Sequence, residues 1–110
     1  MIKHIVMWDL RGDTLADKQA AALLLKSRFE SLVGQIPGMA HLEIGLDRSR
    51  VDYACDVVLY SEFESQQALD AYAAHPAHLR VRQELEGLRI ARHQVDYAGD
   101  AARVRHTVGD

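Results

Sequence analysis

The alternation of apolar and polar residues predicts four β-strands in this chain. Residues 2–10 alternate with a period of two, and comparable runs cover residues 39–46, about 53–61 and about 88–97. One face of the second run carries the apolar side chains of Ala40, Leu42, Ile44 and Leu46. The polar residues 47–52 between the second and third runs predict a hairpin connection.

Apolar residues at helical spacing predict two helices between these strands. The first helix runs from an N-cap at Thr14 to about Val33, and Gly34 terminates it. Its apolar stripe consists of Ala21, Leu25, Phe29, Leu32 and Val33. The second helix is broken at Pro76 and continues to about Gly87.

The resulting order, βαββαβ, predicts an α+β, ferredoxin-like fold with a four-stranded antiparallel sheet and two helices on one face. The first and third strands are apolar on both faces, with Ile5 and Met7 opposite Val6 and Trp8 in the first. Two helices cover only one face, and a sheet whose other face is solvated normally alternates with polar residues. We therefore expect a second copy of the sheet to cover it, in a homodimer that forms a dimeric α/β barrel.

Composition narrows the class of protein further. The chain has 110 residues, 48% hydrophobic and 26% charged, which is typical of one globular domain. Its net charge of −3 gives no reason to expect a nucleic-acid partner, and no apolar run approaches the ~20 residues of a membrane span. A single cysteine, Cys55, excludes an intramolecular disulfide and fits a reducing compartment. With no recognisable signal peptide, we expect a cytoplasmic protein with no membrane partner.

Residues 71–78 place a phenol and two imidazoles around one helix break. Proline lacks an amide hydrogen and is best tolerated at the first position of a helix. Pro76 should therefore begin a helix with His75 as its N-cap and His78 in its first turn, while the helix that carries Tyr72 ends just before it.

Two interpretations of this corner remain open. In the first, Tyr72 and His78 share a pocket and exchange protons with a substrate near neutral pH, so they are the candidate catalytic residues. Alternatively, the histidines only cap the helix, and the tyrosine buries its ring and hydrogen-bonds a carbonyl.

The alternation of the first strand turns His4 toward the helices, either as a satisfied core histidine or within reach of His78. We expect a small, mostly apolar cavity between sheet and helices, lined by His4, Val6, Trp8, Leu59, Tyr72 and His78. His75 completes the candidate ligand-binding set. If Trp8 filled this space, an enzyme would have no substrate site.

Asp56 interrupts the third strand on the face assigned to the dimer, and a buried carboxylate needs a partner. Arg89 and Arg92 of the last strand are the candidates. A metal site is not expected, because the chain has no His-x-His or His-Glu-x-x-His spacing.

Five motifs in order resemble the stress-responsive dimeric α/β-barrel domain family. They are residues 1–6 (Met-Ile-Lys-His-Ile-Val), 36–38 (Ile-Pro-Gly), 61–63 (Ser-Glu-Phe), 75–78 (His-Pro-Ala-His) and 95–97 (Val-Asp-Tyr). The resemblance covers residues 1–98 and implies a ferredoxin-like protomer and a homodimer. It leaves residues 99–110 as a C-terminal tail, which we expect to dock on the dimer. It implies no single activity.

One branch of that family is the plant polyketide cyclase that forms olivetolic acid without a cofactor. Its catalytic tyrosine and histidine match Tyr72 and His78, and its strand-one histidine matches His4. The chain departs from this branch at Ala40, where the cyclase has lysine, and at Val57, where it has histidine. The acid–base pair is therefore matched but the surrounding site is not.

Three functions remain. The favoured one is a stress-associated barrel protein of unassigned activity, which binds a small apolar, aromatic or polyketide-like ligand and needs no cofactor. The second is a cofactor-independent cyclase, lyase or isomerase in which His78 is the general base and Tyr72 orients or protonates an oxygen. The third is a structural dimer without a ligand.

Overall fold

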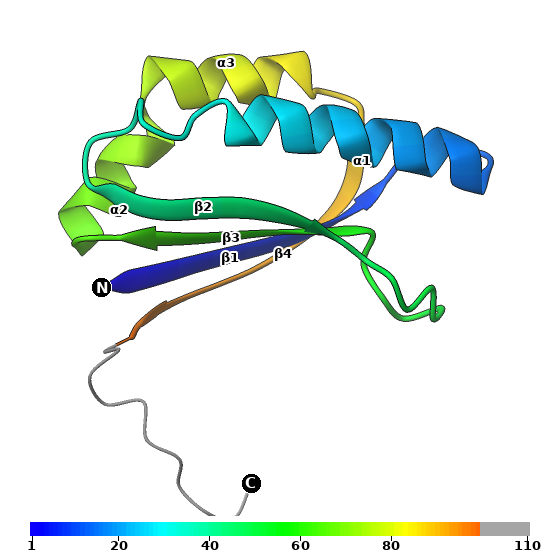
Figure 1. The fold of residues 1–110 in the computed structure, drawn as a ribbon, viewed down its shortest axis with the longest axis horizontal. Coiled ribbons are helices and arrows are strands. Elements are labelled where there is room, and N and C mark those ends of the chain that lie inside the picture. The colour runs from blue at the N-terminus through cyan, green and yellow to red at the C-terminus, as the bar shows by residue number, and fades with distance from the viewer. Residues whose placement is uncertain (100–110) are drawn as a thin grey trace, which may run out of the picture.

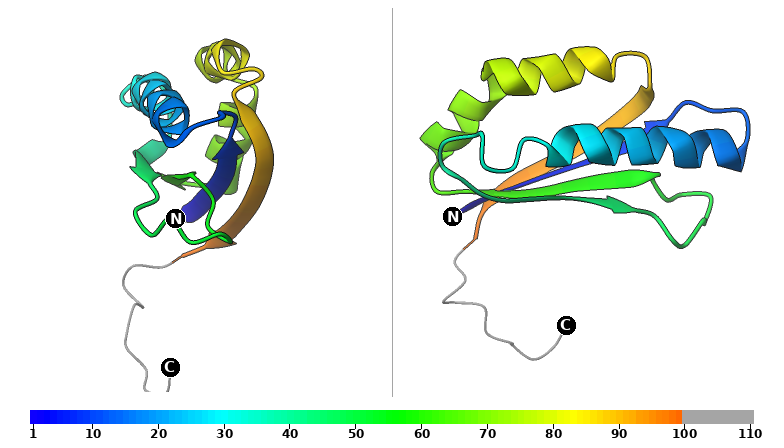
Figure 2. Two further views of the ribbon diagram at one scale, coloured as in Figure 1. Left: turned by 90° about the vertical axis from the view of Figure 1, so that its right-hand side faces the viewer. Right: turned by 45° about the horizontal axis from the view of Figure 1, so that its top comes forward.

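A computed structural model describes residues 1–99, and the predicted C-terminal tail lies outside them apart from Gly99. The elements are β1 (Ile2–Leu10), α1 (Leu15–Glu30), β2 (Met39–Leu46), β3 (Val57–Phe63), α2 (Gln66–Ala73), α3 (Pro76–Glu84) and β4 (Arg89–Ala98). The four strands form one sheet in the order β2-β3-β1-β4, and each neighbouring pair is antiparallel. All the described helices lie on one face of this sheet (Figures 1 and 2). The predicted ferredoxin-like fold is confirmed.

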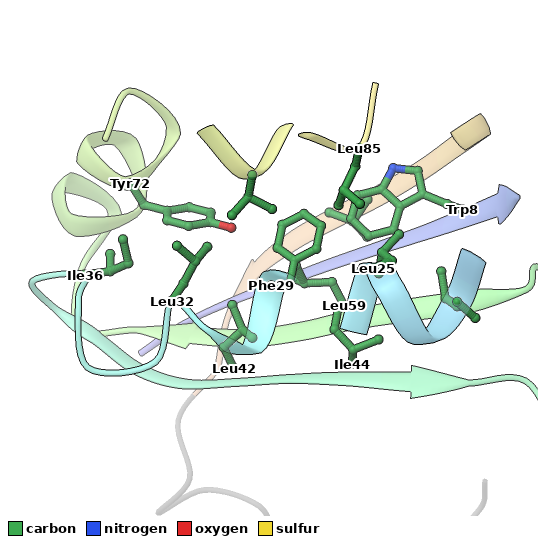
Figure 3. Close-up of a cluster of buried hydrophobic side chains, with 14 of the residues drawn as sticks. Trp8, Leu25, Phe29, Leu32, Ile36, Leu42, Ile44, Leu59, Tyr72 and Leu85 are labelled. Carbon is green, nitrogen blue, oxygen red and sulfur yellow. The ribbon is translucent and has the colours of Figure 1, made fainter. Parts of the chain in front are cut away.

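The core fills the space between this sheet and the helices, as Figure 3 shows. Val6, Trp8 and Leu10 of β1 point into it, so the predicted facing of that strand is confirmed. The Trp8 ring stacks on Phe29 of α1 with ring centroids 5.4 Å apart. Each fully buried side chain of this size contributes about 1.5–3 kcal/mol to stability.

Three predicted boundaries are wrong by about three residues or more, and one of them is the end of the second helix, which lies at Glu84 rather than about Gly87. Helix α1 ends at Glu30 with Ser31 as its C-cap, so Val33 lies beyond the helix and is 58% exposed. Strand β3 begins at Val57 rather than residue 53, and Tyr53 in the preceding loop is 88% exposed.

A register shift in β2 also changes one predicted face. Met39 pairs with Phe63 and His41 with Glu62, which leaves Ala40 as an extra residue between them. Such a bulge reverses the alternation on one side of it. Met39 therefore packs against the core and Ala40 is exposed, whereas alternation predicts Ala40 beside Leu42 in the core.

The predicted helix break is confirmed. Helix α2 ends at Ala73, and α3 begins at Pro76. The Ala77 amide donates a hydrogen bond of 3.0 Å to Nδ1 of His75, which makes this histidine the N-cap. The break changes the chain direction, so that α2 lies at one end of the sheet and α3 runs from there back alongside α1 (Figure 1).

The carboxylate of Asp56 has different partners from those predicted. It accepts a hydrogen bond of 2.7 Å from the Leu10 amide and lies 3.4 Å from the Lys18 ammonium and 3.3 Å from the Arg50 guanidinium. Burial raises the pKa of Asp56, but these donors outweigh it and hold the pKa below its usual range. The predicted pairing with Arg89 or Arg92 is wrong, and so is the predicted dimer-face position of Asp56, because the Leu10 amide, Lys18 of α1 and Arg50 hold its carboxylate.

No described helix covers the second face of the sheet (Figure 2). In β1 this face carries Ile5 and Met7, and their partners in β4 and β3 include Val95 and Val58. Met7 is 38% exposed and Val95 is 50% exposed. The face is thus partly apolar, as the pattern of the first and third strands predicts.

Candidate functional site

A cavity of about 290 Å³ opens between the sheet and helices α2 and α3. Its walls include the predicted residues His4, Val6, Trp8, Leu59, Tyr72 and His78. The expected mostly apolar lining is wrong, because charged and amide side chains from α2, α3 and β4 also line the cavity. Trp8 forms one wall and leaves the space open. His75 is not among the described residues that line this cavity, because its ring is occupied in capping α3.

Tyr72 and His78 meet by stacking. Their ring centroids are 4.1 Å apart, and the ring planes are inclined by 29°. Figure 3 shows the Tyr72 ring projecting from α2 into the molecule. Burial raises the pKa of the Tyr72 hydroxyl well above its usual range, so this group is a proton donor in hydrogen bonds throughout the neutral range.

The His78 imidazole is neutral at physiological pH. Burial lowers its pKa to about 4, and positive charge on Arg82 acts in the same direction. Nδ1 of His78 lies 3.4 Å from the Ala73 carbonyl, a long contact that favours the tautomer with hydrogen on Nδ1. In that tautomer Nε2 carries the lone pair and is able to accept a proton.

A second imidazole lies on the sheet side of the same cavity. Nδ1 of His4 is 2.6 Å from Oδ1 of Asp96, and its ring meets Tyr72 edge to face with centroids 6.2 Å apart. A carboxylate that accepts from Nδ1 fixes the tautomer and leaves Nε2 as the acceptor, which is the arrangement of a histidine base with an orienting acid. The Asp96 carboxylate satisfies the His4 ring, as the core-histidine interpretation requires, and the ring also lines the cavity.

Sequence reasoning missed Asp96 as part of the site. It lies 92 positions from His4, and only the antiparallel register of β1 and β4 sets the two opposite each other. The predicted topology could have indicated this contact, because a ferredoxin-like fold places the last strand beside the first.

Sequence reasoning also missed three arginines in the cavity wall, Arg82 of α3 and Arg89 and Arg92 of β4. Simple alternation puts residues 89 and 92 on opposite faces. In the structure Leu10 pairs with Arg89 and Asp9 with Ala91, so Ile90 is an extra residue. This bulge turns both arginines to the helix side, where the Arg89 guanidinium lies 5.2 Å from the centroid of the Trp8 ring.

The described residues contain no group of three or more histidine, cysteine, aspartate or glutamate side chains arranged to bind a metal ion. Within residues 1–99, no helix has the length and apolar character needed to span a membrane.

The family model for the stress responsive A/B barrel domain matches residues 2–98, and the chain belongs to this family. It is 30% identical over 105 residues to the stress-response A/B barrel domain-containing protein DABB1 of Arabidopsis thaliana. That alignment covers 93% of this chain and 49% of the relative, so the chain spans about half the length of the curated relative that it matches.

Solved structures show the same fold. A dimeric protein of unknown function with a ferredoxin-like fold from Bacteroides fragilis is 31% identical, with a TM-score of 0.77 over 87% of this chain and 93% of that one. A hydroxynitrile lyase from Passiflora edulis is 15% identical, with a TM-score of 0.74 over 91% of this chain and 94% of that one. The second likeness concerns the fold alone.

Proposed function

We propose that this protein is a homodimeric barrel protein that binds a small aromatic ligand between its sheet and its helices. The observation that carries the proposal is the open cavity of about 290 Å³ with aromatic rings in its walls. Ligand sites are typically concave, mainly apolar and equipped with a few convergent polar groups. This volume is at the small end of such sites and suits one or two fused rings.

The aromatic side chains in the cavity wall favour a flat, aromatic ligand. Trp8 and Phe29 offer ring faces or edges on one side, and the stacked pair of Tyr72 and His78 does so on another. Aromatic pairs prefer offset or edge-to-face contacts, and each contributes about 0.5–1.5 kcal/mol beyond the burial of area. An aliphatic ligand of equal size loses that contribution.

Calorimetric titration with 2-naphthol and with the saturated alcohol decahydro-2-naphthol tests this proposal. We expect 2-naphthol to bind at least about fivefold more tightly. Ala73→Phe puts a ring into the cavity wall and should abolish binding, whereas Ala74→Phe, one residue outside the lining, should not. Failure of 2-naphthol to bind, or binding that Ala73→Phe leaves unchanged, contradicts the proposal.

A second candidate function is a cofactor-independent lyase or cyclase. The specific observation in its favour is a neutral imidazole, His78, whose Nε2 is able to accept a proton beside the cavity. In such a reaction Nε2 takes a proton from a substrate C–H or O–H, and the Tyr72 hydroxyl donates a hydrogen bond to the oxygen that gains charge. The imidazolium then returns the proton to the group that carries the negative charge. With a cyanohydrin, the C–CN bond breaks as the aldehyde forms, and the released cyanide takes the proton to give hydrogen cyanide. The Passiflora edulis lyase has the same fold and suggests an aromatic cyanohydrin as a first substrate to assay.

The assay follows release of aromatic aldehyde from the cyanohydrin by absorbance. The enzyme hypothesis predicts turnover that falls by at least about 100-fold in His78→Asn while the assembly and melting temperature stay close to wild type. If the wild-type protein has no turnover and His78→Asn only lowers the melting temperature, His78 is a structural side chain.

A further inference from the structure

We infer that Arg82, Arg89 and Arg92 form an anion subsite, so that the ligand of this cavity is an aromatic carboxylate. The inference rests on the proposed function, because it specifies the chemical class of the same ligand. It is carried by the convergence of three guanidinium groups from two different elements on one end of the cavity.

The three arginines lie where the cavity meets a second hollow of about 290 Å³. Both hollows share these arginines and Trp8, so the three arginines lie on the boundary between the cavity and the second hollow. A ligand whose ring lies against Trp8 and whose charged group points outward would reach all three.

Within residues 1–99, none of these arginines forms an ion pair with a carboxylate. Arg92 donates to the Gln94 side chain at 2.5 Å, and Arg89 approaches the Arg82 carbonyl at 3.5 Å. Burial lowers the pKa of Arg89, and the charges of Arg82 and Arg92 lower it further. The repulsion among three adjacent cations is relieved when an anion binds between them.

The acidic groups of the cavity determine which way a carboxylate ligand is oriented when it binds. Asp70 of α2 and Asp96 of β4 also line it, and Asp96 is engaged by His4. A carboxylate ligand is repelled from these two groups and attracted to the arginines. Its ring then lies beside Tyr72 and His78, where the candidate acid–base chemistry is located. Guanidinium groups bind carboxylates through paired N–H donors, which favours a planar anion.

The test compares 2-naphthoate with its neutral isostere 2-naphthamide by calorimetric titration of the full chain at low ionic strength. We expect 2-naphthoate to bind at least about tenfold more tightly, and the preference to shrink as salt is raised. The double variant Arg82→Gln/Arg92→Gln should remove most of this preference and leave the affinity for 2-naphthamide within about twofold of wild type. Arg80→Gln is the matched control, because Arg80 is an exposed arginine of α3 outside the cavity lining, and it should retain the preference.

Equal affinities for the two probes in the wild-type protein overturn the anion subsite and leave the aromatic ligand proposal standing. The anion subsite is also overturned if the preference for 2-naphthoate survives in the double variant. The same holds if Arg80→Gln loses the preference equally, since the charge effect is then not local. If neither probe binds while 2-naphthol does, only this inference is wrong; if 2-naphthol also fails to bind, the proposed function is wrong as well.

Discussion

His78 owes its chemistry to its surroundings. Partial burial favours the uncharged ring, and the nearby Arg82 adds repulsion against a second cation. The same features that prepare it as a proton acceptor also make its protonation costly to the fold. The contribution of His78 to the stability of the fold should therefore depend measurably on pH.

Because its pKa falls from 6.5 to about 4 on folding, the folded protein binds fewer protons than the unfolded chain between these values. The stability associated with the neutral ring is fully present above pH 6.5 and is lost as the pH falls toward 4. His78→Phe keeps an aromatic ring beside Tyr72 but cannot titrate. We expect the melting temperature of wild type to fall more steeply than that of His78→Phe across this range. Parallel melting curves of the two proteins against pH would show that His78 titrates normally.

Asp56 is a buried polar residue outside the cavity whose removal should be costly to the fold. Asp56→Ala leaves the Leu10 amide without its acceptor and also removes the partner of Lys18 and Arg50. An unsatisfied buried donor costs about 1–3 kcal/mol. Chemical denaturation should show a loss of that size, while Asp52→Ala in the same exposed loop should change the free energy of unfolding by less than about 0.5 kcal/mol. Equal losses in the two variants would contradict this role.

At the scale of elements, local rules predicted the structure better than alternation did. Pro76 and the cap at His75 act within a few residues, so the sequence predicted the corner and the position of Tyr72 and His78. The bulges at Ala40 and Ile90 depend on how a strand pairs with distant partners, and no pattern within either strand reveals them. The arginine side of the cavity was missed for this reason.

The turn between α1 and β2 depends on a glycine for two separable reasons. Gly38 has φ of +78°, and a Cβ atom there would lie 2.6 Å from Cβ of Ala68 in α2. Gly87, between α3 and β4, has φ of +84° with nothing within 4 Å of its Cβ position. Both alanine variants incur the left-handed cost of about 1–2 kcal/mol, but only Gly38→Ala also forces α2 to move. We expect Gly38→Ala to lose at least about 1 kcal/mol more than Gly87→Ala in chemical denaturation. Equal losses would mean that the turn shifts freely away from α2.

At the scale of the whole molecule, the two faces of the sheet differ in what covers them. Even-numbered residues of β1 line the core and the cavity, while odd-numbered residues reach the face that no described helix covers. This division was predictable from the alternation, because the even-numbered set is mainly apolar and the odd-numbered set also contains Ile5 and Met7. The pairing of His4 with Asp96 was harder to predict, since this contact requires β4 to pair with β1.

The uncovered face supports a dimer that a single charge should disrupt. Val95 lies opposite Ile5 on this face and is 50% exposed in the protomer. In a symmetric dimer a substitution occurs twice, and burying an unpaired carboxylate costs several kcal/mol. Val95→Glu should therefore raise the dimer dissociation constant by at least about 100-fold in sedimentation equilibrium. Leu23→Glu is the matched control, because Leu23 is an equally large apolar residue on α1 that is 59% exposed, and it should remain dimeric. Dissociation by Leu23→Glu but not by Val95→Glu would move the interface to the helical layer, and a wild-type monomer at micromolar concentration would contradict the dimer itself.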